Sequence, residues 1–310
     1  MTTIASALVD PVRELDRAVC SDGAPSARNL LVTVFGDVVL PHGPDTETTV
    51  QALTATVADF GVSERLVRTS LSRLVGDGLL ATQPHGRRSS YRVATDALDL
   101  FRSADERIYR GRARDWDGAW TLVVLDGAEA TADHRAHVRA ELSGLGFGVV
   151  APNVLASPLV PLSAAADVLC EAGGVERVVL TRSPLAAGPA MIEPFDLARR
   201  CYELDRLSDG YASLARRLES FDATTLAHLD PRRAMKLRLL VVASFRRLAL
   251  ADPMLPADLL PAEWPGDRAR VHAARVYAAV ARSSDLALSE HLALAVTTDP
   301  DRLRAPSSDR

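Results

Sequence analysis

Arginine and hydroxyl side chains gather between Ser63 and Arg92, and their chemistry is that of phosphate binding. Guanidinium groups pair with phosphate oxygens, and hydroxyl groups add further hydrogen bonds. Six arginines in this stretch are accompanied by only two acidic residues, Glu64 and Asp77, so its local net charge is plus four. The whole chain has a formal net charge of -4. The positive charge is therefore local, and we expect contacts to nucleic acid from Ser63, Arg65, Arg68, Thr69, Ser72, Arg73, Arg87 and Arg88.

A second set of residues could be arranged around a metal ion. His134, His137 and Glu141 recur at steps of three and four on one face of a predicted helix, and Asp133 is adjacent to them. This face lies opposite the apolar face of the same helix. We therefore interpret these side chains as solvated and predict no metal site.

Three glycines, Gly144, Gly146 and Gly148, imitate the start of a dinucleotide-binding fingerprint. They follow a predicted helix and lead into a predicted strand, which is the reverse of the order that phosphate binding at a helix N-terminus requires. We interpret them as the end of a helix. The chain also has no GxSxG elbow, Walker A sequence or zinc-type cysteine pair. We therefore predict no catalytic centre and no cofactor, and we do not expect an enzyme.

The basic residues fall on a predicted helix-turn-helix that is followed by a β-hairpin. Apolar residues at steps of three and four predict a helix from Val50 to Phe60, which Gly61 ends. Ser63 is placed to cap a second helix, whose outer face carries the arginines. Strands at 79–83 and 89–95 follow, joined by a loop with two arginines at its tip. This order is that of a winged helix-turn-helix, although such patterns also occur in protein-binding domains and charged outer faces are often simply solvated.

The composition is that of a globular protein with a reduced, cytoplasmic setting. The chain has 310 residues, of which 47% are hydrophobic and 25% charged. Its three cysteines are far apart and odd in number. The first twenty residues include the charged side chains of Asp10, Arg13, Glu14 and Asp16 where a signal peptide needs an apolar core, and no run approaches the roughly 18 apolar residues of a membrane span. We expect neither export nor membrane insertion.

Beyond the basic unit, the pattern changes from mixed strands and helices to helices alone. Strands are predicted at 120–125, 148–156 and 175–182, with helices at 134–145 and 164–171. With one further short strand, this is a ferredoxin-like βαβ order. We therefore predict an α+β protein with an N-terminal arm (1–25), a winged helix-turn-helix (26–97), a connecting helix (98–115), a ferredoxin-like domain (116–190), an α-helical C-terminal domain (191–299) and a disordered tail (300–310).

Three blocks of sequence, in the same order, resemble the PaaX-type transcriptional repressors of phenylacetate catabolism. The blocks are ARNLLVTVFGD at 27–37, WDGAW at 116–120, and the passage from FRRL at 245–248 through DPMLP to LLPAEWPG at 259–266. The resemblance implies a homodimeric repressor that binds double-stranded operator DNA. It also implies a middle domain similar to the small CRISPR-associated ferredoxin-like nucleases.

That likeness to nucleases leaves a second function open. In such nucleases a carboxylate at the end of the first strand, paired across a dimer, can hold a metal ion for phosphodiester hydrolysis. Asp126 is at this position in the sequence. Asp126 followed by Gly127 is also a common way to leave a strand, and we favour this interpretation over a metal-dependent nuclease.

A repressor also needs a signal that releases it from DNA. Members of the family near the type case respond to phenylacetyl-CoA, so the resemblance implies a small acidic effector such as an aryl- or acyl-CoA thioester. We expect it between the middle and C-terminal domains, at Arg246, Arg247 and Trp264. The proline-rich passage 252–266 either shapes this cleft or is a rigid connection. The sequence leaves open the identity of the effector, the operator, and whether the protein represses or activates.

Overall fold

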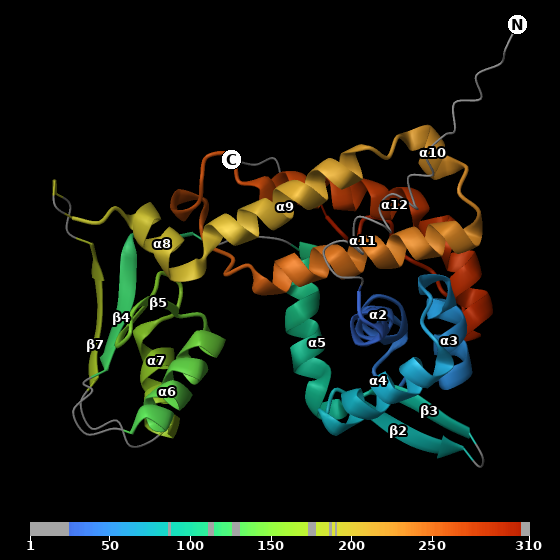
Figure 1. The fold of residues 1–310 in the computed structure, drawn as a ribbon, viewed down its shortest axis with the longest axis horizontal. Helices are drawn as coiled ribbons and strands as arrows, with labels where there is room; N and C mark the ends of the chain where they lie inside the picture. The colour runs from blue at the N-terminus through green and yellow to red at the C-terminus, as the bar shows by residue number, and fades with distance from the viewer. Residues whose placement is uncertain are drawn as a thin grey trace, which may run out of the picture. The chain divides into compact units, whose positions relative to one another are not determined.

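The computed structural model describes residues 25–85, 88–110, 115–125, 131–172, 178–185, 188–189 and 191–304. The chain divides into two compact units (Figure 1). The head unit comprises the described parts of Met1–Gly111, Tyr211–Leu250 and Pro265–Arg310, and the sheet unit those of Arg112–Gly210 and Ala251–Trp264. Each unit mixes helices with one antiparallel sheet. The predicted N-terminal arm lies outside the described residues, apart from Pro25.

The head unit begins with three helices and a three-stranded sheet. The helices are α2 (Ala27–Val34), α3 (Val50–Val57) and α4 (Glu64–Gly76). A π-helical turn and a 3-10 turn extend α2 as far as His42, and a 3-10 turn extends α3 to Phe60. The sheet has the order β1-β3-β2, with strands β1 (Thr48–Thr49), β2 (Leu80–His85) and β3 (Arg88–Val93).

The boundaries of these helices follow from hydroxyl caps and one glycine. Ser26, Thr49 and Ser63 accept hydrogen bonds from the backbone N–H three residues further on, which satisfies one free donor at each helix start. Gly61 has a φ of 72° and ends the first helix of the pair, a conformation that costs glycine little. The predicted cap at Ser63 and the predicted stop at Gly61 are confirmed.

The connecting helix and helices from the C-terminal part of the chain complete the head unit. They are α5 (Leu98–Asp105) with a π-helical turn to Arg110, the C-terminal part of α9 (Leu204–Glu219), α10 (Ala223–Ala227), α11 (Pro231–Ala251) and α12 (Pro265–Leu292). Apolar side chains of α5, α11 and α12 join those of α2, α3 and α4 in one continuous core, to which α11 contributes Met235 and Leu239 and α12 contributes Leu288 and Leu292. The N-terminal helices therefore do not have a core of their own.

An ion-pair network centred on Asp37 lies inside this core. Asp37, in the π-helical turn after α2, is 2% exposed. Its carboxylate accepts hydrogen bonds from the hydroxyls of Tyr109 (2.7 Å) and Tyr277 (2.9 Å) and from Nε of Arg238 (2.7 Å). Arg302 donates to its backbone carbonyl at 2.8 Å. The network thus joins the first helix, the connecting helix, both long C-terminal helices and the end of the chain.

Charges in this network stabilise one another against their burial. Burial raises the pKa of Asp37, but the guanidiniums of Arg238 and Arg302 outweigh it and hold the pKa below its ordinary value. Burial likewise opposes the charge of Arg238, yet Asp37 raises its pKa above the ordinary value. Asp285 adds a second ion pair to Arg238 at 2.9 Å. Arg238 therefore pairs with one buried and one partly buried carboxylate, and removal of Asp37 leaves its buried charge only partly compensated.

Residues 300–304, which the sequence assigns to a disordered tail, are ordered. Leu303 is buried, and Arg302 pairs with Asp105 at 2.6 Å in addition to its bond with the Asp37 carbonyl. Single contacts of Arg302 and Leu303 hold this segment in place. It therefore has no periodic apolar pattern that could indicate its structure. Residues 305–310 lie outside the described part of the chain.

The sheet unit has a four-stranded antiparallel sheet of the order β5-β6-β4-β7. Its elements follow each other as β4 (Ala119–Leu125), α6 (Ala132–Leu145), β5 (Gly148–Ala151), β6 (Val154–Ser157), α7 (Leu162–Ala172) and β7 (Val178–Pro184). Helices α6 and α7 cover one face of the sheet (Figure 1), where Val123, Val138 and Leu155 form the core. Helix α8 (Pro194–Tyr202) packs against β5.

The single strand predicted over 148–156 is in fact a hairpin of two strands. Pro152 and Asn153 form its turn, because a proline has no N–H to donate to a strand partner. Val149 pairs with Leu155 across the hairpin, and the register shifts after Val149. The prediction of one long strand was therefore wrong, because the segment forms two short strands.

Gly148 lies against Cys201 of α8, and we expect a methyl group there to destabilise the sheet unit. A Cβ at Gly148 would lie 2.5 Å from Cβ of Cys201 and 2.8 Å from its carbonyl oxygen, and the carbonyl cannot move alone. Gly148→Ala should lower the free energy of unfolding by about 1 to 3 kcal/mol, measured by denaturant titration. Gly144, in α6, has nothing within 4 Å of an added Cβ. Gly144→Ala should therefore raise stability by about 0.5 to 1 kcal/mol, and equal effects of both substitutions would contradict this packing.

Candidate nucleic-acid interface

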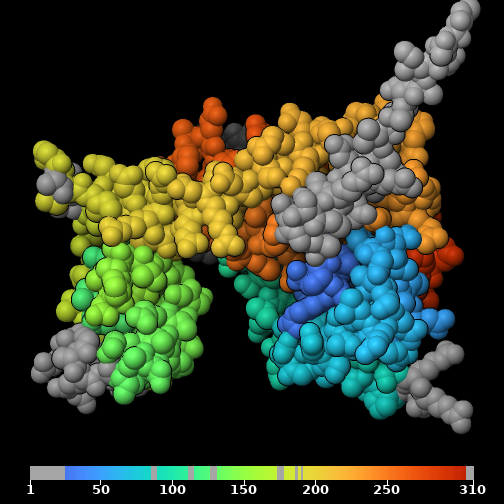
Figure 2. All heavy atoms as spheres, viewed as in Figure 1, coloured from blue at the N-terminus to red at the C-terminus, as the bar shows by residue number. Residues whose placement is uncertain are grey.

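Helix α4 presents one buried face and one charged face. Val67, Leu71 and Leu74 are fully buried and fix the helix on α2 and α3. The opposite face carries the predicted residues Arg65, Arg68, Thr69, Ser72 and Arg73, all of them exposed. In Figure 2 the atoms of α3, α4 and the hairpin form the free edge of the head unit. The structure therefore brings these five side chains together on one surface that a ligand can reach.

Local interactions already orient two of these side chains. Arg68 makes an ion pair with Glu64 one turn earlier, at 2.6 Å, and both side chains remain more than half exposed. Thr69 donates a hydrogen bond to the carbonyl of Arg65 at 2.9 Å. An exposed i,i+4 ion pair contributes only about 0.3 to 0.5 kcal/mol. Arg68 can therefore exchange Glu64 for a phosphate or a base edge at little cost.

Two further ion pairs lie near the ends of α4. Arg28 at the start of α2 pairs with Asp77, the C-terminal cap residue of α4, at 2.6 Å. Arg232 on α11 pairs with Asp59 at 2.9 Å, next to the turn that precedes α4. These partly exposed pairs add little energy, so the buried face of α4 with Val67, Leu71 and Leu74 is what positions the helix in the head unit.

The remaining predicted contacts, Arg87 and Arg88, belong to the β2–β3 hairpin after α4, and the structure describes this hairpin only in part. Arg87 lies outside the described residues, and of Arg88 the structure describes the backbone, which pairs with His85 in the β2–β3 register. Arg92, counted in the local charge, donates to the carbonyl of Val93 at 3.1 Å and is partly buried. Pro84 in β2 is tolerated because β2 is the edge of its sheet.

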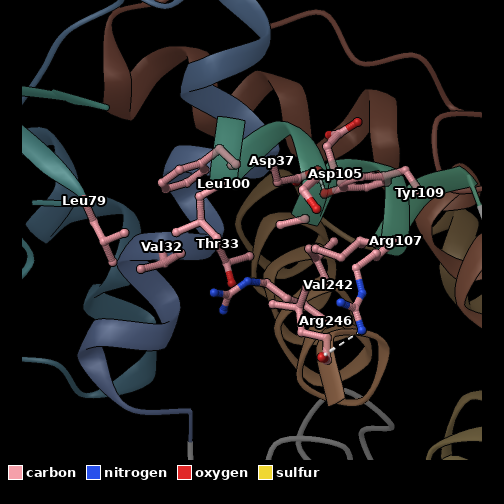
Figure 3. Close-up of a pocket in the computed structure, with 16 residues that line it drawn as sticks. Val32, Thr33, Asp37, Leu79, Leu100, Asp105, Arg107, Tyr109, Val242 and Arg246 are labelled. Atoms are coloured by element: carbon pink, nitrogen blue, oxygen red, sulfur yellow. Dashed lines mark hydrogen bonds between the residues drawn. The ribbon is translucent and has the colours of Figure 1, made fainter. Parts of the chain in front are cut away.

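The three predicted effector residues have three different environments. Arg246 on α11 is partly buried and lines a pocket of about 230 Å³ inside the head unit (Figure 3). Arg247 is exposed and does not line this pocket. Trp264 is 5% exposed and belongs to the sheet unit. The pocket therefore confirms none of these residues as effector ligands, and it includes only the first of them.

Other residues that line this pocket were not found from the sequence. They include Asp37, Arg107 and Tyr109, each of which is a member of the buried network or a neighbour of it. One signal was present, because Asp37 is a lone carboxylate in an otherwise apolar helical run. A charged residue within such a run is buried only with a partner, and the partners come from more than 70 positions away.

The residues considered for metal binding give no positive sign of a site. His137 and Glu141 are 4.0 Å apart on α6, and both are exposed. Within the described part of the chain, no group of three His, Cys, Asp or Glu side chains could hold a metal ion. Asp126, the carboxylate of the nuclease alternative, lies outside the described residues.

Helices α11 and α12 are long but carry charges throughout, and the described residues include no helix that could span a bilayer.

These elements define a mixed helix-and-sheet protein with a basic helical surface, and comparisons with known proteins refine this class. Profiles of three domain families match in succession: "PaaX-like protein" at 26–97, "PaaX protein central Cas2-like domain" at 113–191 and "PaaX-like protein C-terminal domain" at 202–290. The chain belongs to the PaaX family. The resemblance seen in the three sequence blocks is therefore confirmed.

One curated relative and one solved structure are similar over most of the chain. The Transcriptional repressor PaaX of Escherichia coli (strain K12) is 33% identical over 270 residues, which are 86% of this chain and 84% of that protein. The uncharacterized protein Rv0674 from Mycobacterium tuberculosis has a similar fold, with a TM-score of 0.54 and 27% identity, over 85% of this chain and 99% of that one.

Proposed function

We propose that this protein is a sequence-specific DNA-binding transcriptional repressor. The observation that carries the proposal is the exposed face of α4, where three arginines and two hydroxyl side chains lie opposite a fully buried apolar face. The name of the curated relative, a transcriptional repressor, supports the same function. In this proposal residues 26–97 are a winged helix-turn-helix, with α4 as the recognition helix and the β2–β3 hairpin as the wing.

The proposal includes a homodimer and a ferredoxin-like middle domain. Two recognition helices of a dimer enter successive major grooves about 34 to 36 Å apart, which requires an inverted-repeat operator. The purified full chain can select operators from a pool of random duplexes, so the regulated genes need not be identified first. Footprinting on a selected duplex is expected to show two protected half-sites, and one unrepeated site would contradict the dimer.

We further propose a division of labour between helix and wing. Arg65, Arg68, Thr69 and Ser72 contact base edges, while Ser63 and Arg73 at the two ends of α4 and Arg87 and Arg88 in the wing contact the backbone. Arg68→Ala should cost about 1 to 3 kcal/mol of binding free energy and relax the preference for one base pair. Arg87→Ala should weaken binding to all duplexes alike and reduce the salt slope by about one. Titrations at several salt concentrations test both, and two variants that lose only non-specific affinity would refute the assignment.

The repressor is released, in this proposal, by a small acidic effector such as an aryl- or acyl-CoA thioester. To reduce operator occupancy tenfold, the effector must favour the DNA-incompetent state by only about 1.4 kcal/mol. The alternative of a nuclease centred on Asp126 has no support from the curated relative, which is named as a repressor. Incubation with labelled DNA and RNA in Mg²⁺ or Mn²⁺ separates the two functions, because only a nuclease gives cleavage that Asp126→Asn abolishes.

A further inference from the structure

One acidic side chain lies on the basic face of α4. Glu64 is the first residue of this helix and the only acidic residue within it, and its side chain is 57% exposed. A carboxylate in the first turn interacts favourably with the helix dipole, which accounts for its presence in the helix. On a surface that contacts DNA, however, phosphate groups repel the same charge. Glu64 therefore lowers the affinity for DNA unless a hydrogen-bond donor on the DNA compensates it.

Glu64 and Arg68 are joined by a pair of hydrogen bonds. Oε1 of Glu64 accepts from Nε of Arg68 at 2.9 Å and from Nη2 at 2.6 Å. The two residues are four positions apart, so their side chains lie on the same face of the helix. Nε and Nη2 form one edge of the planar guanidinium. Within the described part of the chain, Oε2 of Glu64 and Nη1 of Arg68 have no hydrogen-bond partner.

The remaining atoms of this pair match the major-groove edges of guanine and cytosine. The second edge of the guanidinium consists of Nη1 and the other N–H of Nη2, and two parallel donors of this kind bind O6 and N7 of guanine. Oε2 can only accept, and the major groove offers donors only at N4 of cytosine and N6 of adenine. N6 of adenine lies beside the acceptor N7, which repels a carboxylate. Cytosine is therefore the better partner for Glu64.

We propose that Glu64 is a specificity-determining residue, which reads a cytosine while Arg68 reads a guanine. Arg68 keeps its bonds to Glu64 in the complex, because the two contacts use different edges of the guanidinium. The ion pair also holds the guanidinium in one orientation, which reduces the side-chain freedom that is lost on binding. This inference rests on the proposed function. It assigns to each half-site of the operator a guanine and a cytosine that is paired with it or belongs to the adjacent base pair.

The carboxylate of Glu64 also acts against other sequences. Thymine presents O4 in the major groove, and guanine presents O6 and N7, all of which are acceptors. Either base at the position of the cytosine would face Oε2 with a second acceptor and leave both without a donor. Glu64 therefore raises specificity chiefly because it weakens binding to incorrect duplexes.

The test is a selection from random duplexes with the full chain and its variants, followed by titration of duplexes that differ only at the position of the cytosine. Glu64→Gln should replace the preference for cytosine by one for adenine, because an amide binds both N6 and N7 of adenine. The ratio of its affinities for the two duplexes should differ from that of the wild type by about tenfold or more. Glu64→Asp keeps the charge on a shorter side chain, so it should lose the preference for cytosine without a new one.

The matched control is Asp99→Asn. Asp99 on α5 has a 92% exposed side chain and pairs with Arg102 three positions further on, at 2.7 Å. This substitution therefore removes one carboxylate charge and one exposed ion pair outside α4. It should change neither the selected sequence nor the ratio of affinities. Thermal unfolding of each variant shows whether it is folded.

Two results would overturn the inference while the proposed function stands. One is selection of the wild-type sequence by folded Glu64→Gln and Glu64→Asp variants, and the other is an equal change of preference in Asp99→Asn. Arg68→Ala should lose the preference for the guanine, and an unchanged guanine in its selected sequence would also contradict the shared reading. A wild-type chain that selects no sequence contradicts the proposed function itself, and the role of Glu64 is then refuted with it.

Discussion

Replacing Asp37 with asparagine is expected to lower the free energy of unfolding of the head unit by about 3 to 5 kcal/mol. The side chains have nearly the same size, so the substitution removes charge and creates no cavity. Arg238, which is 1% exposed, then loses its closest carboxylate and keeps only the partly exposed Asp285. Denaturant titration followed by far-ultraviolet circular dichroism measures the change.

The matched control for this prediction is Asp77→Asn. Asp77 also pairs with an arginine at 2.6 Å, but its side chain is 55% exposed, so its loss should cost no more than about 1 kcal/mol. Similar costs for the two substitutions would show that burial of the ion pair does not matter. This comparison separates the energetic effect of burial from the effect of pairing.

The stability difference between wild type and Asp37→Asn should depend on pH in one direction. The folded pKa of Asp37 is held below its ordinary value, so the carboxylate stabilises the fold above the unfolded pKa of about 3.9. That contribution is lost as the pH falls through the lower folded pKa. Tyr109 and Tyr277 have raised pKa values and stay neutral in this range. The difference should therefore shrink below about pH 4, and a difference independent of pH would contradict the assignment.

Shortening Leu71 to alanine is expected to destabilise the head unit by about 2 to 5 kcal/mol. Leu71 is fully buried and anchors α4 in the core that the N-terminal and C-terminal helices share. The loss combines removed apolar contact with a cavity that the surrounding helices cannot fill completely. Calorimetric unfolding of the full chain measures it.

Leu66 provides a control on the same helix. Its side chain is 47% exposed, so Leu66→Ala should change stability by no more than about 0.5 kcal/mol. A loss at Leu66 as large as that at Leu71 would mean that the outer face of α4 is covered, and the proposed DNA interface would then be wrong.

Local features of the fold could be predicted because they depend on neighbouring residues. Ser63 as a cap, Gly61 as a stop and the apolar face of α4 each need only a few positions of sequence. The same holds for the exposed position of Arg65, Arg68 and Arg73, since the side chains opposite a buried stripe must face outward.

Features that depend on distant residues could not be predicted in this way. Asp37 is stabilised by Arg238, which lies 201 positions further along the chain, and no local pattern indicates this pairing. The helical C-terminal domain was expected without its helix ends, and the last helix extends from Pro265 to Leu292, where tertiary contacts of Leu288 and Leu292 hold its end in the core. The pocket could not be predicted for the same reason, since four separate segments of the chain form its walls.

The shared core of the head unit sets a rule for the construction of chimeric regulators. A grafted segment limited to residues 26–97 would leave behind Met235, Leu239, Leu288 and Leu292, which close its apolar face, and Arg238, which neutralises Asp37. Such a graft would expose apolar surface and a carboxylate that water must then solvate. To transfer the specificity of one family member to another, the exchange must instead include α11, α12 and the segment up to Arg302, or must confine itself to the outward side chains of α4 and the wing.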